Sequence, residues 1–272
     1  MCECSRDSAS LHVARWLAGL TLVGVILAVW SNAAFAYRPF DGTDAAVAEP
    51  EKVEIEFQPI GHLREGANKS LIAPATVLNI GFADRWEAVF EGKGLLPLSP
   101  AGPMELTDAG VFLKHVLRSG SLQDKSGLSI ATEFGVLLPG INADQGFGAS
   151  LAGIASQRWD WGTVHFNTAV ALTRDQHVDV FTGVILEGPS KWTVRPVAEI
   201  FYEQEFNQSR TLSGLVGLIW QVREDLAFDV GFRHALTNGH SVDEIRAGMT
   251  FGFPTQLTKL AGSNLKPAFA TR

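Results

Sequence analysis

The chain has 272 residues, of which 46% are hydrophobic and 19% charged, and its net charge at pH 7 is −7. The acidic balance and the lack of a basic cluster argue against nucleic-acid binding. The length is sufficient for one sizeable domain.

The first 36 residues are typical of a secretory signal peptide. Arg6 and Arg15 precede an uncharged apolar run from Trp16 to Trp30, and Ala34-Phe35-Ala36 forms a small-x-small cleavage site. The run is short for a transmembrane helix, which needs about 20 residues. We therefore expect export and cleavage after Ala36, with a retained N-terminal anchor as the alternative.

Both cysteines, Cys2 and Cys4, lie in this leader. The mature chain therefore has no disulfide, thiol nucleophile or cysteine-based metal site, which fits passage through an oxidising periplasm. No later apolar stretch is long enough for a transmembrane helix. An exported chain of this kind is either a soluble periplasmic or secreted protein, or a β-barrel.

Residues 37–51 contain Pro39, Gly42 and Pro50 among small residues, and we interpret them as a periplasmic lead-in. Runs in which apolar and polar residues alternate follow, and a period of two is the mark of a strand. There are twelve of them: Lys52–Ile60, Leu71–Phe82, Trp86–Glu91, Asp108–Ser119, Leu128–Leu138, Phe147–Ser156, Val164–Thr173, His177–Glu187, Lys191–Glu203, Thr211–Val222, Leu226–Arg233 and Glu244–Phe253.

Two segments allow alternative interpretations. Asp108–Ser119 also fits a helix capped by Thr107 and ended by Gly120, but a strand forms a natural hairpin with the next run, and we favour it. The longest connector, Gly92–Thr107, is rich in Leu and Pro. It is either a constriction over a lumen or a surface loop packed on the rim.

The final run has a distinctive ending. Its apolar residues alternate up to Phe253, and the Gly-x-x-aromatic-x-aromatic pattern resembles the signal that closes bacterial outer-membrane β-barrels. Most runs have the roughly 9–11 residues that a spanning strand needs, and an even number places both barrel ends on the periplasmic side. The chain departs from the pattern because residues 254–272 follow, which we expect to form a C-terminal periplasmic tail.

Aromatic residues gather beside the connectors expected on the periplasmic side. Indole rings favour the boundary between lipid and water, so we predict a membrane-interface girdle, although core burial is the alternative for any single ring. Its members are Trp86, Trp159, Trp161, Trp192, Trp220, Phe251 and Phe253.

Charged and polar residues collect on the opposite face of the runs, which points inward in a barrel. They either set the selectivity of a lumen or pair as a salt-bridged filler. The candidates are Glu87, Glu91, Lys114, Arg118, Glu133, His165, Asn167, Arg195, Glu199, Glu203, Asp229, Arg233, Glu244 and Arg246.

Histidine contexts argue against an enzyme. No histidine lies in a His-x-Ser pattern; His165 shares a strand face with Asn167, and His177 shares one with Asp179, but no serine is placed with either. We predict no catalytic residue, no metal site and no cofactor. An outer-membrane lipid hydrolase that depends on His165 or His177 is the alternative.

Tyr37–Ala45 and Phe112–Arg118 resemble segments of a family of outer-membrane proteins named after the MetA pathway of phenol degradation. The resemblance implies transport of small, aromatic or weakly polar molecules. We predict an all-β fold, an antiparallel transmembrane β-barrel of about 12 strands over residues 52–253. Its partners would be the outer-membrane lipid bilayer, the barrel-assembly machinery and a small solute. A soluble secreted β-sandwich that binds a ligand is a further alternative.

Overall fold

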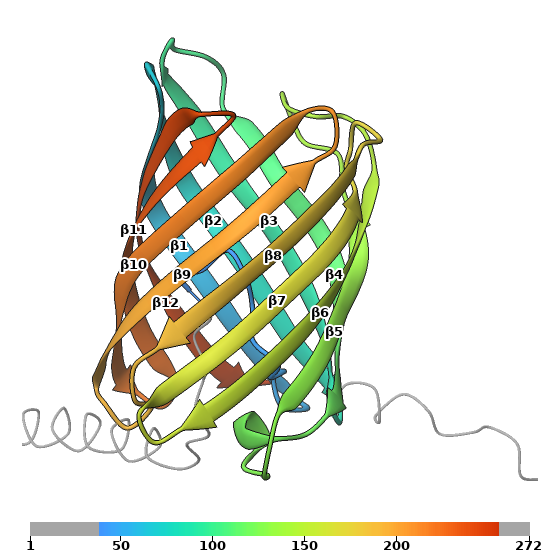
Figure 1. The fold of residues 1–272 in the computed structure, drawn as a ribbon, viewed down its shortest axis with the longest axis vertical. Coiled ribbons are helices and arrows are strands. Elements are labelled where there is room, and N and C mark those ends of the chain that lie inside the picture. Colours follow the sequence, from blue (N-terminus) through green and yellow to red (C-terminus); the bar gives the residue numbers. More distant parts are fainter. Residues whose placement is uncertain (1–37, 256–272) are drawn as a thin grey trace, which may run out of the picture. The chain divides into compact units, whose positions relative to one another are not determined.

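The computed structural model describes residues 38–255. They form one closed sheet of twelve antiparallel strands, in which each strand pairs with the next and β1 pairs with β12 (Figure 1). The predicted fold class is confirmed, and the two-sheet sandwich is excluded. The predicted signal peptide, its cleavage after Ala36 and nearly all of the tail lie outside the described residues.

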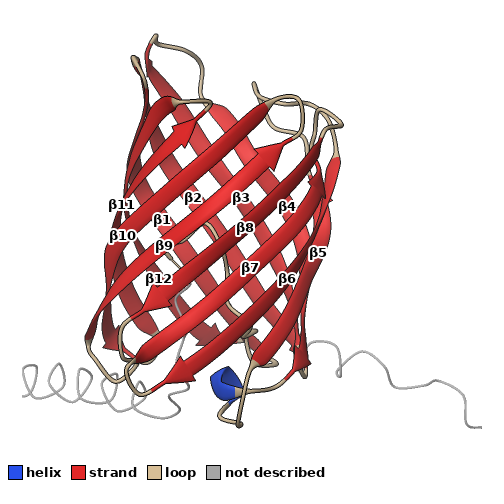
Figure 2. Cartoon of the chain, in the orientation of Figure 1, coloured by secondary structure: helices blue, strands red, loops and turns tan. Residues whose placement is uncertain are grey.

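The strands are longer than most of the predicted runs, and one short 3₁₀ helix follows β4 (Figure 2). The elements are β1 (Lys52–Glu65), β2 (Asn68–Ala83), β3 (Trp86–Ser99), β4 (Glu105–Arg118), η1 (Ser121–Gln123), β5 (Ser129–Leu137), β6 (Gly148–Trp159), β7 (Gly162–Leu172), β8 (Val178–Glu187), β9 (Val194–Glu205), β10 (Ser209–Arg223), β11 (Leu226–Thr237) and β12 (His240–Pro254).

The two ends of the barrel are named here by the chain ends. Lys52 pairs with Pro254, so β1 begins and β12 ends at one rim, the terminal rim. The other end is the opposite rim. The connectors at the terminal rim are 84–85, 119–128, 160–161, 188–193 and 224–225, and those at the opposite rim are 66–67, 100–104, 138–147, 173–177, 206–208 and 238–239.

The prediction of a long loop over Gly92–Thr107 is wrong. β3 continues to Ser99 and β4 begins at Glu105, with Lys93 paired to Thr107, so only residues 100–104 connect the two strands. The glycines and prolines of this stretch interrupt the apolar–polar alternation, which hid the strand in the sequence. Asp108–Ser119 is a strand, as favoured, because it pairs with β3 up to His115 and with β5 up to Arg118.

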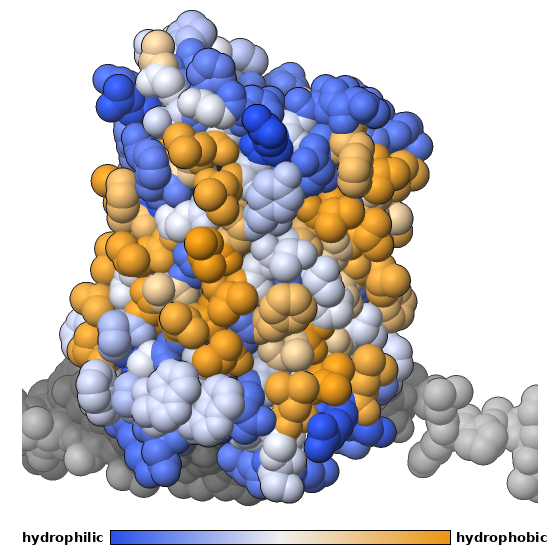
Figure 3. Space-filling model, in the orientation of Figure 1, coloured by the Kyte–Doolittle hydropathy of each residue, from blue (hydrophilic) through white to orange (hydrophobic). Residues whose placement is uncertain are grey.

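The outer wall is apolar. Hydrophobic side chains cover the middle of the face in Figure 3, and hydrophilic ones gather toward both rims. Val216 and Ile200, near the middle of their strands, are 62% and 58% exposed. Soluble proteins rarely expose so large an apolar surface, whereas barrels in lipid require one.

None of the helices in the described part of the chain is long and apolar enough to cross a bilayer.

Candidate functional site: a lumen closed by the N-terminal segment

The inward face carries the predicted polar side chains. Alternation along each strand buries most of the candidates inside the barrel. Glu87, Lys114, His165, Asn167, Arg195, Glu199, Asp229, Glu244 and Arg246 are buried; Glu91, Glu133, Glu203 and Arg233 are partly buried; Arg118, near the terminal rim, is exposed. Several of them contact a segment of the chain that lies in the lumen.

That segment is residues 38–50, called the plug below. The sequence interpretation placed it outside the barrel, whereas the structure threads it through the lumen, where it hydrogen-bonds to inward side chains of several strands (Figure 1, blue). The plug has no regular strand or helix. Its backbone amides must therefore find partners on the wall, because buried unpaired N–H groups are costly.

The centre of the plug is held by two wall residues. Glu199 accepts hydrogen bonds from the backbone N–H groups of Asp41 at 2.8 Å and Gly42 at 2.7 Å. Asn167 accepts from the N–H of Thr43 at 3.0 Å and donates to its carbonyl at 2.8 Å. A Cβ on Gly42 would lie 3.1 Å from a Glu199 oxygen, so only glycine permits this approach without displacement of the carboxylate.

An arginine group holds the first part of the plug. Arg246 donates to the Pro39 carbonyl at 2.8 Å and to Asp41 at 2.7 Å, and also pairs with Glu244 on its own strand. Burial acts to raise the pKa of Asp41, but the guanidinium groups of Arg246 and Arg233 outweigh it and hold the pKa below its usual value. Asp41 therefore remains ionised in place.

A lysine group holds the later part. The Lys114 Nζ lies 3.1 Å from the Thr43 hydroxyl oxygen, 3.4 Å from Asp44 Oδ1 and 3.5 Å from Glu87 Oε1. Glu87 also accepts the Ala48 N–H at 2.6 Å. The buried cation is thus surrounded by carboxylates of both plug and wall, which offsets its loss of water.

Two apolar contacts anchor the plug on opposite sides of this polar centre. Phe40 packs against Val197, Ile219 and Ala227. Ala45 packs in a cluster with Leu122 of η1, and Gln123 of η1 donates to its carbonyl at 2.8 Å. The β4–β5 connector therefore helps to hold the plug at the terminal rim.

His165 has partners that the sequence analysis missed. Ser156 on the neighbouring strand lies 2.8 Å from Nδ1, and Glu187 on the other neighbour lies 3.1 Å from Nε2. These are the residue types of a hydrolytic triad. However, Ser156 is completely buried, and its Oγ accepts the Ala45 N–H at 3.0 Å, so the plug occupies the place that a substrate would need.

The second histidine pair is absent. His177 lies 3.7 Å from Glu205 and 3.0 Å from the Gln208 side chain, rather than beside Asp179. Within residues 38–255, no group of three or more His, Cys, Asp or Glu side chains is arranged to hold a metal ion.

The predicted aromatic residues all lie toward the terminal rim, where β3 begins and β6, β10 and β12 end. Trp159 stacks on Trp161 with ring centroids 5.3 Å apart, and Trp86 stacks on His115 with ring centroids 4.0 Å apart. Trp161, Trp192 and Trp220 are more than half exposed. Their role as a membrane girdle stays a prediction.

No family model and no curated protein sequence matches the chain. Among solved structures, the chain is similar to an outer membrane channel from Pseudomonas putida F1, with a TM-score of 0.56 and 8% identity over 80% of this chain and 100% of that one. It is also similar to the KdgM porin, with a TM-score of 0.49 and 10% identity over 74% and 99% of the two chains. At these identities the likeness concerns the fold of outer-membrane β-barrels.

Proposed function

We propose that the protein is an outer-membrane channel for small molecules, seen here in a closed state. The observation that carries the proposal is the polar lumen, whose charged and amide side chains bind the plug as well as one another. A barrel whose interior is only structural filler has no need of such a segment. Displacement of the plug would open a lumen lined by Lys114, Asn167, Glu199 and Arg246.

The outer membrane is the proposed location because the wall is apolar between two hydrophilic rims. The terminal rim, with its tryptophans, would face the periplasm, and the barrel-assembly machinery would insert the chain. The resemblance of Tyr37–Ala45 and Phe112–Arg118 to the phenol-degradation family favours aromatic or weakly polar solutes.

Reversal potentials test the role of the lumen charges. The mature chain would be refolded, inserted in a planar bilayer and measured across a salt gradient. In a channel whose lining sets selectivity, Glu199→Gln shifts the reversal potential toward anion preference, and Arg195→Gln shifts it toward cation preference. Val216→Ala on the outer wall is the matched control and leaves it unchanged. Open channels with the same reversal potential in all variants would refute the selectivity role.

A further inference from the structure

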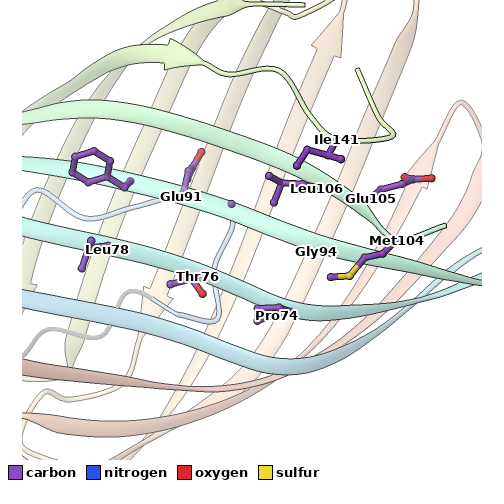
Figure 4. Close-up of a pocket in the computed structure, with 11 residues that line it drawn as sticks. Pro74, Thr76, Leu78, Glu91, Gly94, Met104, Glu105, Leu106 and Ile141 are labelled. Carbon is purple, nitrogen blue, oxygen red and sulfur yellow. The ribbon is translucent and has the colours of Figure 1, made fainter. Parts of the chain in front are cut away.

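A separate pocket lies on the outer wall, away from the plug (Figure 4). It spans β2, β3 and β4 below the 138–147 connector and has a volume of about 560 Å³. That volume is within the range of small-molecule sites, roughly 300–1,000 Å³. Phe90, Met104 and Ile141, which line it, remain exposed, so its mouth opens on the apolar surface.

Irregular strand pairing builds the pocket. The register of β2 against β3 shifts between Ile72 and Ala75, and that of β3 against β4 shifts between Glu91 and Lys93. Both neighbours of β3 therefore carry an extra residue, β2 opposite Gly94 and β4 opposite Gly92, and a strand bends where this occurs. Between these bends β3 presents Gly92 and Gly94, which leave the wall without side chains at that point.

The two glycines have different surroundings. A Cβ on Gly94 would lie 2.6 Å from the Met104 methyl carbon and 2.8 Å from the Ala73 carbonyl oxygen. A residue larger than glycine at position 94 would therefore force β2 and β3 apart. A Cβ on Gly92 would meet only Leu106, at 3.6 Å. Gly94 thus shapes the pocket, and Gly92 borders its empty space.

Hydrogen bonds fix the edge of the pocket beside the 138–147 connector. Leu106 and Ile141 exchange backbone hydrogen bonds of 2.9 and 3.1 Å, and the Asn142 side chain donates to the Met104 carbonyl at 2.9 Å. The Arg174 side chain donates a hydrogen bond of 2.7 Å to the Leu138 carbonyl in the same connector. The pocket is therefore held open by hydrogen bonds rather than by a loose loop.

We propose that this pocket binds an uncharged, compact hydrocarbon-like molecule taken from the bilayer. Its lining is largely apolar, and sites lined by hydrophobic side chains bind apolar ligands. Glu105 also lines it, and its carboxylate disfavours anionic amphiphiles such as fatty acids. The pocket lies across three strands and is bounded by a fixed edge, which suits a compact ring better than a long acyl chain.

Methionine methyl signals give a direct test with naphthalene as the probe. The chain has three methionines, of which Met104 lines the pocket, whereas Met249 lies on β12, is separated from β2 by β1 and contributes nothing to the lining. In the full mature chain, labelled with ¹³C-methyl methionine in deuterated-lipid nanodiscs, naphthalene should shift the Met104 signal to saturation. The Met249 signal should show only the small, linear shift caused by partitioning into lipid.

A matched pair of variants identifies the site. Gly92→Leu fills the pocket and should abolish the saturable shift, while Gly214→Leu should leave it intact, because a Cβ there meets nothing nearer than 4.0 Å. Parallel, unsaturated shifts of both methyl groups would overturn the proposal. So would a saturable Met104 shift that survives Gly92→Leu. A repeat in nanodiscs of protonated lipid would also overturn it if the Met104 methyl contacts lipid chains that naphthalene does not displace. None of these outcomes depends on whether the lumen conducts.

Discussion

The two sides of the barrel wall differ in regularity. From β5 to β10 the strands pair without any register shift, whereas β1–β4 and the β1–β12 pair carry several. The regular side supplies Glu199, Asn167 and Ser156, which hold the plug by short hydrogen bonds. The irregular side builds the outer pocket. Both sides thus bind the plug's backbone, because Glu87 of β3 accepts the Ala48 N–H at 2.6 Å, but only the side with register shifts makes room on the lipid side.

The largest effect is expected when the regular side loses its hold on the plug. The double variant Glu199→Ala, Asn167→Ala leaves the N–H groups of Asp41, Gly42 and Thr43 without their acceptors. Each buried unpaired group costs about 1–3 kcal/mol. Because about 1.4 kcal/mol is a factor of ten, the open fraction in single-channel records should rise at least about tenfold. An unchanged open fraction would show that these contacts do not keep the lumen closed.

The outer face of the regular side should respond differently, as substitutions on β10 would show. Val216→Arg places a charge near the middle of the lipid-facing wall and should lower the unfolding free energy in lipid vesicles by about 2–4 kcal/mol. Leu212→Arg, nearer the opposite rim, should cost less. Equal and negligible losses for both would contradict a membrane position for this wall.

Two glycines on the irregular side should differ in how much their replacement destabilises the barrel. Gly94→Ala should destabilise the barrel by about 1–3 kcal/mol, since its methyl group would collide with Met104 and the Ala73 carbonyl. Gly92→Ala should change stability by less than about 0.5 kcal/mol. Urea unfolding in vesicles measures both changes. Equal losses of unfolding free energy in the two variants would show that the close approach of β2 and β3 at Gly94 does not determine the shape of this wall.

The smallest effect is expected at Ser156. Ser156→Ala removes one hydrogen bond to the plug and the contact with His165, so the open fraction should rise only several-fold, corresponding to about 1 kcal/mol. The same variant tests hydrolysis. Release of fatty acid from phospholipid vesicles that disappears in Ser156→Ala would show that the Ser156–His165–Glu187 arrangement is catalytic.

Alternation in the sequence was sufficient to place side chains on the two faces of the wall. Glu199, Asn167 and Lys114 point inward because every second residue does, whatever the pairing partner. It was not sufficient to place Ser156 opposite His165, since that depends on the register between β6 and β7, which the connector determines.

The plug was missed for a different reason. Residues 38–50 lack periodicity, and the wall binds them largely through backbone N–H and carbonyl groups, which leave no trace in the residue types. Pro39 and Gly42 made the segment look like a linker. The β3–β4 hairpin was misjudged because β3 contains Gly92, Gly94 and Pro97, and glycine and proline are also the common residues of loops.

Single-channel conductance of the mature chain, with and without residues 38–50, is the most direct measurement of the proposed closed channel. Insertion would be verified for both proteins by protease protection. The proposal predicts rare, brief openings for the intact chain and frequent, larger unitary steps for the deletion variant. Identical records, or silence from an inserted deletion variant, would contradict a lumen that the plug closes.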